Sequence, residues 1–287
     1  MNRIVKVSFF LAILCWVGCR SSESKEVQNV QPVKIASLNG AVSEILVQLG
    51  LEENLVGVDV TSTYPSSLSE LPQLGHPRNL SVEGLVSILP HRVLAIEGSL
   101  DPDKVNQIKE AGIQLDFFEH EQSVDGVYRL IDEIAQLFDK AKPATKLKER
   151  IKNEMEALDQ NQGFGKVLFI YARGSGNLMV AGTDTPADAF IELAGGSNAA
   201  TGFDGFKPLT AEAVLLADPE IFLLFESGLS SLEGMDGLLA IPGVAETQAG
   251  KNKSIVTMDG QLMLGFGPRL PQALAEFKDK ATAFANP

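Results

Sequence analysis

Short hydrophobic runs alternate along the chain with segments in which apolar residues recur every three or four positions. The runs are rich in Val, Ile, Leu and Phe, which is typical of strands buried in a sheet. The longer period is typical of helices with one apolar face. Strands that alternate with helices in this way predict parallel sheets covered by helices.

The pattern occurs twice, and we therefore predict two Rossmann-like α/β lobes, residues 33–142 and residues 163–287. In the first lobe, strands are predicted at 33–38, 55–59, 92–97 and 113–118, with helices near 40–50, 81–89, 101–111 and 123–140. In the second lobe, strands are predicted at 166–171, 178–182, 220–225 and 254–259, with helices near 185–194, 210–216, 229–239 and 268–284.

Residues 143–162, between the lobes, predict a single long helix. Pro143 suits a first helical turn and Gly163 follows the end. Apolar residues recur at helical spacing at Leu147, Ile151, Met155 and Leu158. We expect this rigid helix to join the lobes and to leave a ligand cleft between them.

The N-terminus has the form of a secretory signal. Arg3 and Lys6 precede an apolar run that is short for a membrane-spanning helix and ends in Gly18-Cys19. This ending resembles a bacterial lipoprotein cleavage site, so we predict a signal peptide at 1–18, lipidation of Cys19 and a tether at 19–32. An ordinary secretory signal or an uncleaved anchor is the alternative. In each case we expect an extracytoplasmic protein.

Charge and cysteine content narrow the possible partners and chemistry. The formal net charge of -13 argues against a nucleic-acid partner, which needs a broad basic face. An anionic ligand must then be held by a few local cations. Cys15 and Cys19 are the only cysteines, so the rest of the chain has neither disulfides nor thiol chemistry.

No catalytic signature is present, and the three histidines share no metal-ligand spacing. His91 and His120 flank predicted strand ends, and we expect both to be solvated. His76 lies in the same long loop region as Tyr64, a tyrosine within the polar stretch VDVTSTYPSSL. The ring of a loop tyrosine usually packs on an apolar surface, and its hydroxyl is exposed to solvent. The alternative is that the Tyr64 oxygen points into a cleft, and the residues alone leave both open.

Several segments occur in the order found in one known family. They are VKIASLNGAVSEILVQLGLEENLVGVD, then TYP, GHPRNLSVEGLVSILPHRVLAIEG, MVAGTDTPADAFIELAGGSNAATGFDGFKPLTAEAVLLADPEIFLL and LMLGFGPRLPQALAEF. Together they resemble the periplasmic substrate-binding proteins that serve ABC importers of vitamin B12, siderophores and haem. PRNLSVEG, GFKPLTAEA and LGFGPRLPQAL resemble the haem-binding branch. The resemblance implies two α/β lobes bridged by one long helix.

The resemblance also implies an axial iron ligand at Tyr64. A phenolate is a hard, anionic donor suited to ferric iron. Some relatives carry a histidine near the loop YARGSG, where this chain has Arg173. Arginine is not a usual iron ligand, so Arg173 would pair with a propionate or hydrogen-bond the Tyr64 phenolate. His76 is a possible alternative ligand, and the coordination number stays open.

Cations and apolar walls would complete a haem site. Arg78 and Arg269 are candidates for the propionates, although Arg269 would face solvent if it belonged to a first helical turn. The candidate apolar walls, each of which would otherwise be ordinary core, are Met179, Phe203, Phe206, Leu264 and Phe266.

Glu83 and Glu212 occupy similar places, one in each lobe, just inside a predicted helix. In relatives such a pair meets arginines of the transporter's membrane subunits. The simpler reading is that Ser81 and Thr210 cap these helices and that an acidic residue is favourable near a helix N-terminus. Both readings can hold together.

The resulting hypothesis is a monomeric, membrane-tethered protein that binds hemin and delivers it to ABC transporter permease subunits, without a reaction or a catalytic cofactor. The same fold with cobalamin or a ferric siderophore is the first alternative. A chelatase-like enzyme acting on a tetrapyrrole, with His76 in its cleft, is the second. A purely structural surface lipoprotein is the third.

Overall fold

The computed structural model describes residues 32–158 and 163–285, and the chain from Val33 onward forms one compact unit. The predicted signal peptide, lipidated Cys19 and the tether lie outside the described residues, except for Pro32. Among the described residues, no helix has the length and apolar character needed to cross a membrane.

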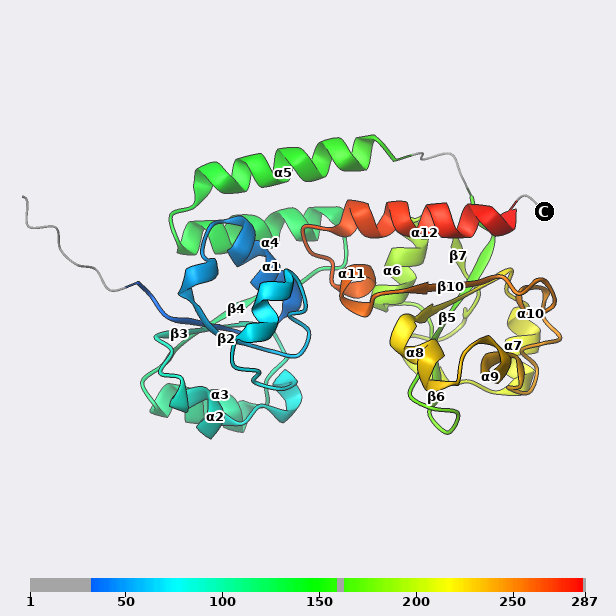
Figure 1. Cartoon of the computed structure of the whole chain (residues 1–287), viewed down its shortest axis with the longest axis horizontal. Helices are drawn as coiled ribbons and strands as arrows, with labels where there is room; N and C mark the ends of the chain where they lie inside the picture. Colours follow the sequence, from blue (N-terminus) through cyan, green and yellow to red (C-terminus); the bar gives the residue numbers. More distant parts are fainter. Residues whose placement is uncertain (1–31, 159–162, 286–287) are drawn as a thin grey trace, which may run out of the picture. The chain divides into compact units, whose positions relative to one another are not determined.

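A four-stranded parallel sheet forms the N-terminal lobe, with strand order β2-β1-β3-β4 (Figure 1). Its strands are β1 (Ile35–Ser37), β2 (Leu55–Val58), β3 (Arg92–Ile96) and β4 (Gln114–Phe118). Its helices are α1 (Gly40–Gln48), α2 (Val82–Ser87), α3 (Pro102–Glu110) and α4 (Val124–Leu137), with 3₁₀ turns η1 (Glu52–Asn54), η2 (Ser66–Glu70) and η3 (Pro77–Asn79). The predicted strands and helices of this lobe are all present.

The C-terminal lobe contains a mixed sheet of six strands among the described residues. Its strands are β5 (Lys166–Ala172), β6 (Leu178–Ala181), β7 (Ser197–Asn198), β8 (Phe206–Pro208), β9 (Ile221–Phe225) and β10 (Ile255–Met258). β10, β9, β5 and β7 run parallel, but β6 is antiparallel to both β5 and β8. The prediction of a parallel sheet is wrong for β6, because the turn at 173–177 is too short for a crossover connection.

The helices of this lobe are α6 (Pro186–Leu193), α7 (Ala211–Ala217), α8 (Glu226–Ser231), α9 (Met235–Leu239), α10 (Gln248–Asn252), α11 (Gly260–Leu264) and α12 (Leu270–Ala285). The single helix predicted at 229–239 is instead α8 and α9. Gly234 separates them with a φ of 91°, a conformation that side chains disfavour. The short elements β7, β8, α10 and α11 were not predicted.

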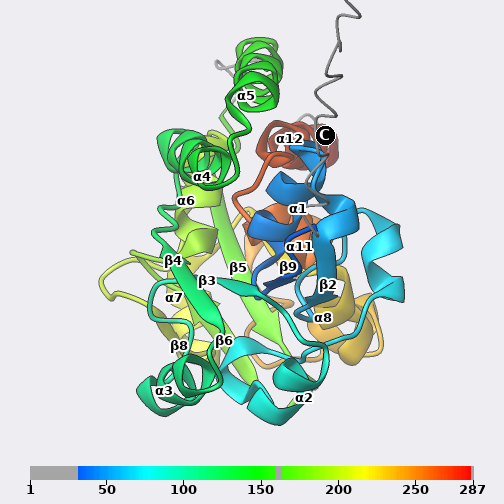
Figure 2. The same cartoon turned by 90° about the vertical axis from the view of Figure 1, so that its left-hand side faces the viewer.

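Helix α5 (Ala141–Glu156) follows α4 and precedes the second sheet. It packs against α4 of the first lobe and against α12 of the second (Figures 1 and 2). Its buried stripe is thin and consists of Ala144, Leu147 and Ile151. The predicted fold of two α/β lobes with a connecting helix is confirmed. The helix ends at Glu156, before the predicted 162, and the exact lobe boundaries stay a prediction.

The two lobes share one apolar core. It extends from Ile45 in α1 and Ile131 in α4 through Ile151 in α5 to Phe277 in α12. The Phe277 ring makes edge-to-face contacts with Phe164 and Phe190, with centroids 5.6 and 5.8 Å apart. Burial of this continuous surface holds the lobes together.

Candidate ligand-binding site

A cavity of about 570 Å³ is lined by side chains of both lobes. Its lining is Asn39, Val60, Thr61, Thr63, His76, His120 and Gln122 from the first lobe, and Tyr171, Arg173, Pro186, Phe225, Asp259, Gly260, Gln261, Leu264 and Gly265 from the second. Much of the lining follows the carboxyl ends of strands, where open α/β sheets bind their ligands. The volume lies within the range of about 300–1,000 Å³ that is usual for small-molecule sites.

Arg173 and Tyr171 come from the same strand end. They are two residues apart at the end of β5, so both side chains leave the strand on one side. The Arg173 guanidinium lies 5.4 Å from the centroid of the Tyr171 ring. The Phe225 ring also contacts the Tyr171 ring, with the two centroids 6.0 Å apart. Arg173 is exposed, and within the described part of the chain no ion pair involves it. The cavity therefore has a phenol beside an unpaired cation.

Tyr171 was missed by the sequence reasoning. It is the last large residue of the run KVLFIY, which reads as an ordinary strand. The signal that could have found it is its position at the carboxyl end of a parallel strand, two residues before a candidate site residue. The loop YARGSG forms a turn between β5 and β6, and the Gly174 N–H donates to the Ser231 hydroxyl at 2.9 Å.

The loop that carries Thr61 and Thr63 is held by a buried carboxylate. Asp59 accepts hydrogen bonds from the Thr61 and Ser62 hydroxyls, each at 2.7 Å. Burial raises the pKa of Asp59, and these two hydrogen bonds act in the opposite direction. Ser43 of α1 lies 2.7 Å from the Ser62 hydroxyl and extends the network. This loop is therefore anchored on the first sheet and on α1.

Tyr64 lies next to this cavity rather than among its lining residues. It is 42% exposed and directly follows Thr63, which does line the cavity. The Arg269 guanidinium carbon lies 3.8 Å from the centroid of its ring. The Tyr64 ring therefore packs against a charged neighbour.

Arg269 is neither a free cation nor a solvent-facing one. Its Nε donates to Oε1 of Glu44, and the two side chains are only 15% and 3% exposed. Burial raises the pKa of Glu44, while the charge and hydrogen bond of Arg269 lower it. Arg269 immediately precedes α12 and Glu44 lies in α1, so this buried ion pair connects the two lobes. The charge of Arg269 is therefore already paired with a carboxylate, and its role at a propionate stays a prediction.

His76 and Arg78 lie at a second cavity, of about 310 Å³, in the first lobe. His76 lines both cavities, so the two adjoin at this residue. The His76 Nδ1 accepts the Arg78 backbone N–H at 3.2 Å, which leaves Nε2 as the other ring nitrogen. The Arg78 side chain is exposed, and it forms no ion pair within the described residues.

His120 was predicted to be solvated, and this prediction is wrong. It is largely buried and lines the cavity, and its Nε2 donates to the Phe266 carbonyl of the other lobe at 3.2 Å. Burial lowers the pKa of His120, although backbone hydrogen bonds to Phe266 and Gly265 oppose this. His91, by contrast, is exposed, and its Nδ1 accepts the Lys34 N–H at 3.0 Å. Among the described residues, no group of three or more His, Cys, Asp or Glu forms a metal site.

The predicted apolar walls are dispersed. Leu264 lines the cavity between the lobes. Phe266 is fully buried in the shared core, Phe203 lines a separate cavity, and Phe206 is 43% exposed on β8. Met179 pairs with Tyr171 across β5 and β6 but is not among the lining residues. The structure therefore brings together Leu264, His76 and Arg173 and leaves the three phenylalanines elsewhere.

Glu83 and Glu212 occupy equivalent positions in the first turns of α2 and α7. The Ser81 hydroxyl accepts the Gly84 N–H at 3.1 Å, and the Thr210 hydroxyl accepts the Ala213 N–H at 3.2 Å. Both glutamates are exposed. Capping therefore accounts for how these helices begin, and both carboxylates remain accessible.

These features define a two-lobed α/β protein with a ligand cavity between its lobes. Residues 35–262 match the family model described as periplasmic binding protein, and the chain belongs to this family. A curated relative, the uncharacterized ABC transporter substrate-binding lipoprotein YvrC of Bacillus subtilis, is 27% identical over 87% of this chain and 80% of its own length. The name of this relative describes it as a substrate-binding component of an ABC transporter.

Relatives and solved structures differ in the ligands that their names give. The vitamin B12-binding protein of Vibrio campbellii is 22% identical over 70% of this chain and 74% of its own. The periplasmic heme-binding protein RhuT from Roseiflexus sp. RS-1 is 38% identical, with a TM-score of 0.81 over 87% of this chain and 99% of its own. The periplasmic heme-binding protein BhuT, solved with two hemes, is 35% identical, with a TM-score of 0.82 over 88% and 98%.

Proposed function

We propose that this protein captures hemin outside the cytoplasm and delivers it to an ABC importer. The observation that carries the proposal is the cavity between the lobes, which has the Tyr171 phenol and the unpaired Arg173 guanidinium on its wall. A phenolate suits ferric iron, and a guanidinium pairs with a propionate carboxylate. The match to haem-binding proteins at 38% and 35% identity supports the same ligand.

Two phenols are candidates for the iron. Tyr64 is favoured by the resemblance of its TYP segment, and Tyr171 is favoured by its place in the cavity wall. His76 is the alternative donor, with Nε2 as the nitrogen not engaged by the Arg78 N–H. Arg173 and Arg78 would pair with the two propionates.

Delivery would use the surface and the N-terminus rather than the cavity. Glu83 and Glu212 would meet basic residues of the permease subunits, one from each lobe. A lipid on Cys19 would keep the monomeric protein at the membrane surface, close to its importer. No chemical reaction is part of this role.

The test is a visible-absorption titration of the purified full-length protein with hemin, run beside Tyr64→Phe and Tyr171→Phe. Each substitution keeps the ring and removes only the oxygen. A saturable spectrum of the ferric phenolate type that is lost in one variant would identify that tyrosine as the ligand. Saturable binding with the same spectrum in both variants and in the double variant would move the ligand to His76. Absence of saturable hemin binding would refute the proposal.

Cobalamin is the second candidate, because curated relatives at 22–25% identity are named as vitamin B12- or cobalamin-binding proteins. A parallel titration with cyanocobalamin decides between the ligands. Cobalamin does not need a phenolate ligand for iron, so both Tyr→Phe variants should bind it as tightly as the wild type does. Tight cobalamin binding without hemin binding would favour this candidate.

A further inference from the structure

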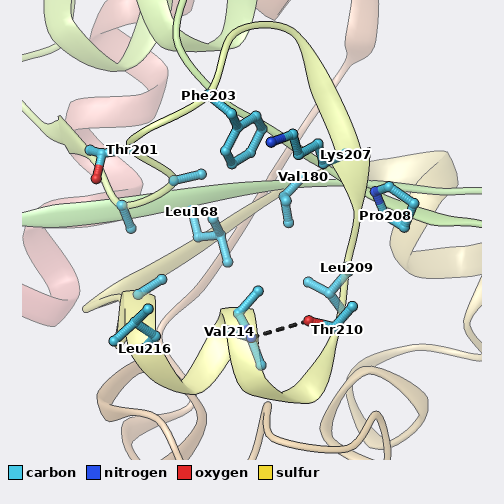
Figure 3. A pocket seen from close by; sticks show the side chains of 14 residues that line it. Leu168, Val180, Thr201, Phe203, Lys207, Pro208, Leu209, Thr210, Val214 and Leu216 are labelled. Carbon is cyan, nitrogen blue, oxygen red and sulfur yellow. Dashed lines mark hydrogen bonds between the residues drawn. The ribbon is translucent and has the colours of Figure 1, made fainter.

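Helix α7 borders a cavity of about 510 Å³ in the C-terminal lobe, and this cavity shares no lining residue with the one between the lobes. Leu168 and Val180 of the sheet form its floor, and Val214 and Leu216 of α7 form one wall (Figure 3). Phe203 and Lys207 form the wall across from α7, with the Lys207 amine 4.5 Å from the Phe203 ring centroid. The lining is predominantly apolar, so the cavity suits an apolar group.

The mouth of this cavity exposes apolar side chains. Leu216 lines the cavity and is 85% exposed. Leu216 and Leu89, at 67%, are the most exposed large hydrophobic side chains among the described residues. Leu89 comes two residues after the end of α2, the helix that carries Glu83. Leu216 therefore presents an apolar side chain to solvent at the edge of an apolar cavity.

The acidic residue proposed for docking lies on the same helix face as the cavity wall. Glu212 and Leu216 are four residues apart in α7, which places them one turn apart on one face. Within the described part of the chain, no ion pair or side-chain hydrogen bond involves the Glu212 carboxylate, so this carboxylate is available to a basic group. Glu212 therefore lies one helical turn from a wall residue of the apolar cavity.

We propose that this face of α7 is a two-part docking site for the importer's permease. Glu212 pairs with a basic side chain of the permease, and a neighbouring apolar side chain of the same subunit enters the α7 cavity. This inference rests on the proposed role as an importer's binding protein. It adds a partner of defined chemistry: a basic residue with an aliphatic or aromatic residue beside it.

Two other occupants are disfavoured by the same observations. A small ligand is usually about 70–90% buried in its site, but the Leu216 wall of this cavity is largely open. A second copy of the chain would bring Glu212 and a net charge of -13 against the same charges. A basic protein surface meets both the charge and the open apolar wall.

The experiment measures affinity of the hemin-loaded full-length protein for its importer, with permease and ATPase subunits reconstituted in nanodiscs. Leu216→Ser removes the exposed wall, and Ala213→Trp fills the cavity from α7. Leu215→Ser is the matched control, because Leu215 is an adjacent, 46% exposed leucine that does not line the cavity. Hemin titration and thermal unfolding of each variant show that folding and ligand binding are retained.

We expect Leu216→Ser and Ala213→Trp each to weaken importer binding roughly tenfold, and Leu215→Ser to change it less than about twofold. High salt should weaken the contribution of Glu212 to importer affinity and should leave the contribution of Leu216 unchanged. Unchanged binding of Leu216→Ser and Ala213→Trp, with weakened binding of Glu212→Gln, would overturn the inference and leave the proposed function intact. An equal loss in Leu215→Ser would also overturn it.

The other occupants have their own signatures. A dimer in analytical ultracentrifugation that Leu216→Ser dissociates would assign the surface to a second copy. A co-purified apolar molecule in native mass spectrometry, displaced by Ala213→Trp, would assign the cavity to a small ligand. Either result overturns the inference. Failure of the wild type to bind hemin is a separate result that refutes the proposed function itself.

Discussion

The Arg269 guanidinium carbon lies 3.8 Å from the centre of the Tyr64 ring, and the same guanidinium pairs with Glu44. Arg269 belongs to the second lobe, whereas Tyr64 and Glu44 belong to the first. A cation on an aromatic face is worth about 0.5–2 kcal/mol, depending on how far it is desolvated. One side chain thus joins the lobes and positions a candidate iron ligand.

Arg269→Gln should lower the free energy of unfolding by about 3 kcal/mol, because it leaves the Glu44 carboxylate buried without its partner. Urea denaturation at neutral pH measures this loss. The double variant Glu44→Gln/Arg269→Gln should lose less than the sum of the two single variants, since neither charge is then left alone. Additive losses would show that the two residues act independently.

The pKa of His120 should appear in the pH dependence of stability. Burial lowers this pKa in the folded state below its ordinary value of 6.5, so the unfolded chain binds the proton more readily. His120 therefore makes the protein less stable as the pH falls below 6.5. Urea midpoints measured on both sides of that pH give the slope.

Two variants isolate the His120 contribution. His120→Gln should remove this part of the slope, whereas His91→Gln, at an exposed histidine, should keep it. The raised pKa values of Glu44 and Asp59 act in the opposite sense, because their contribution is lost as the pH rises through the folded values. An unchanged slope in His120→Gln would contradict the assignment.

Arg173→Ala should weaken hemin binding roughly tenfold, because a charge-assisted hydrogen bond to a carboxylate is lost. Arg173→Lys should recover part of the affinity through its charge but not the geometry of the planar guanidinium. Hemin titration at two ionic strengths measures both. Lys152→Ala removes an exposed cation of α5 that does not line the cavity and should bind hemin normally. Equal effects of Arg173→Ala and Lys152→Ala would indicate only a general charge effect.

Glu83→Ala/Glu212→Ala should abolish most importer-dependent hemin uptake while leaving hemin affinity unchanged. Both helices keep their Ser81 and Thr210 caps, so the cost in stability should be about 0.3–1 kcal/mol for each lost carboxylate. Uptake into proteoliposomes measures the effect. The control Glu110→Ala/Glu192→Ala removes one exposed carboxylate from each lobe elsewhere, in α3 and α6. Uptake equal to wild type in the Glu83/Glu212 variant would contradict the docking role.

Several local features were predictable because they depend on neighbouring residues. The strands of both sheets are short apolar runs, and the helices at α2 and α7 begin at Ser81 and Thr210, whose hydroxyls cap them. The turn after β5 contains Gly174, which has a φ of 72°. The alternation of strand and helix signals, which occurs in both halves of the chain, predicted the two-lobed fold.

Contacts between distant residues were not predictable in this way. Glu44 and Arg269 are 225 positions apart, and His120 meets Phe266 across 146 positions. Each of these residues has an unremarkable local context, so burial and pairing change its role without a sequence signal. Phe266 was predicted to face a ligand, but it is fully buried in the core that the two lobes share.

The sequence by itself determined the longer elements of both lobes and the positions of Arg173, Glu83 and Glu212 at element ends, because periodicity and capping are local properties. Only the tertiary structure decided that Tyr171 shares the cavity wall with Arg173, that Arg269 is already paired and that α7 borders a second cavity. The physical reason is that burial and charge pairing depend on which surfaces meet after folding, and residues far apart in the chain supply those surfaces.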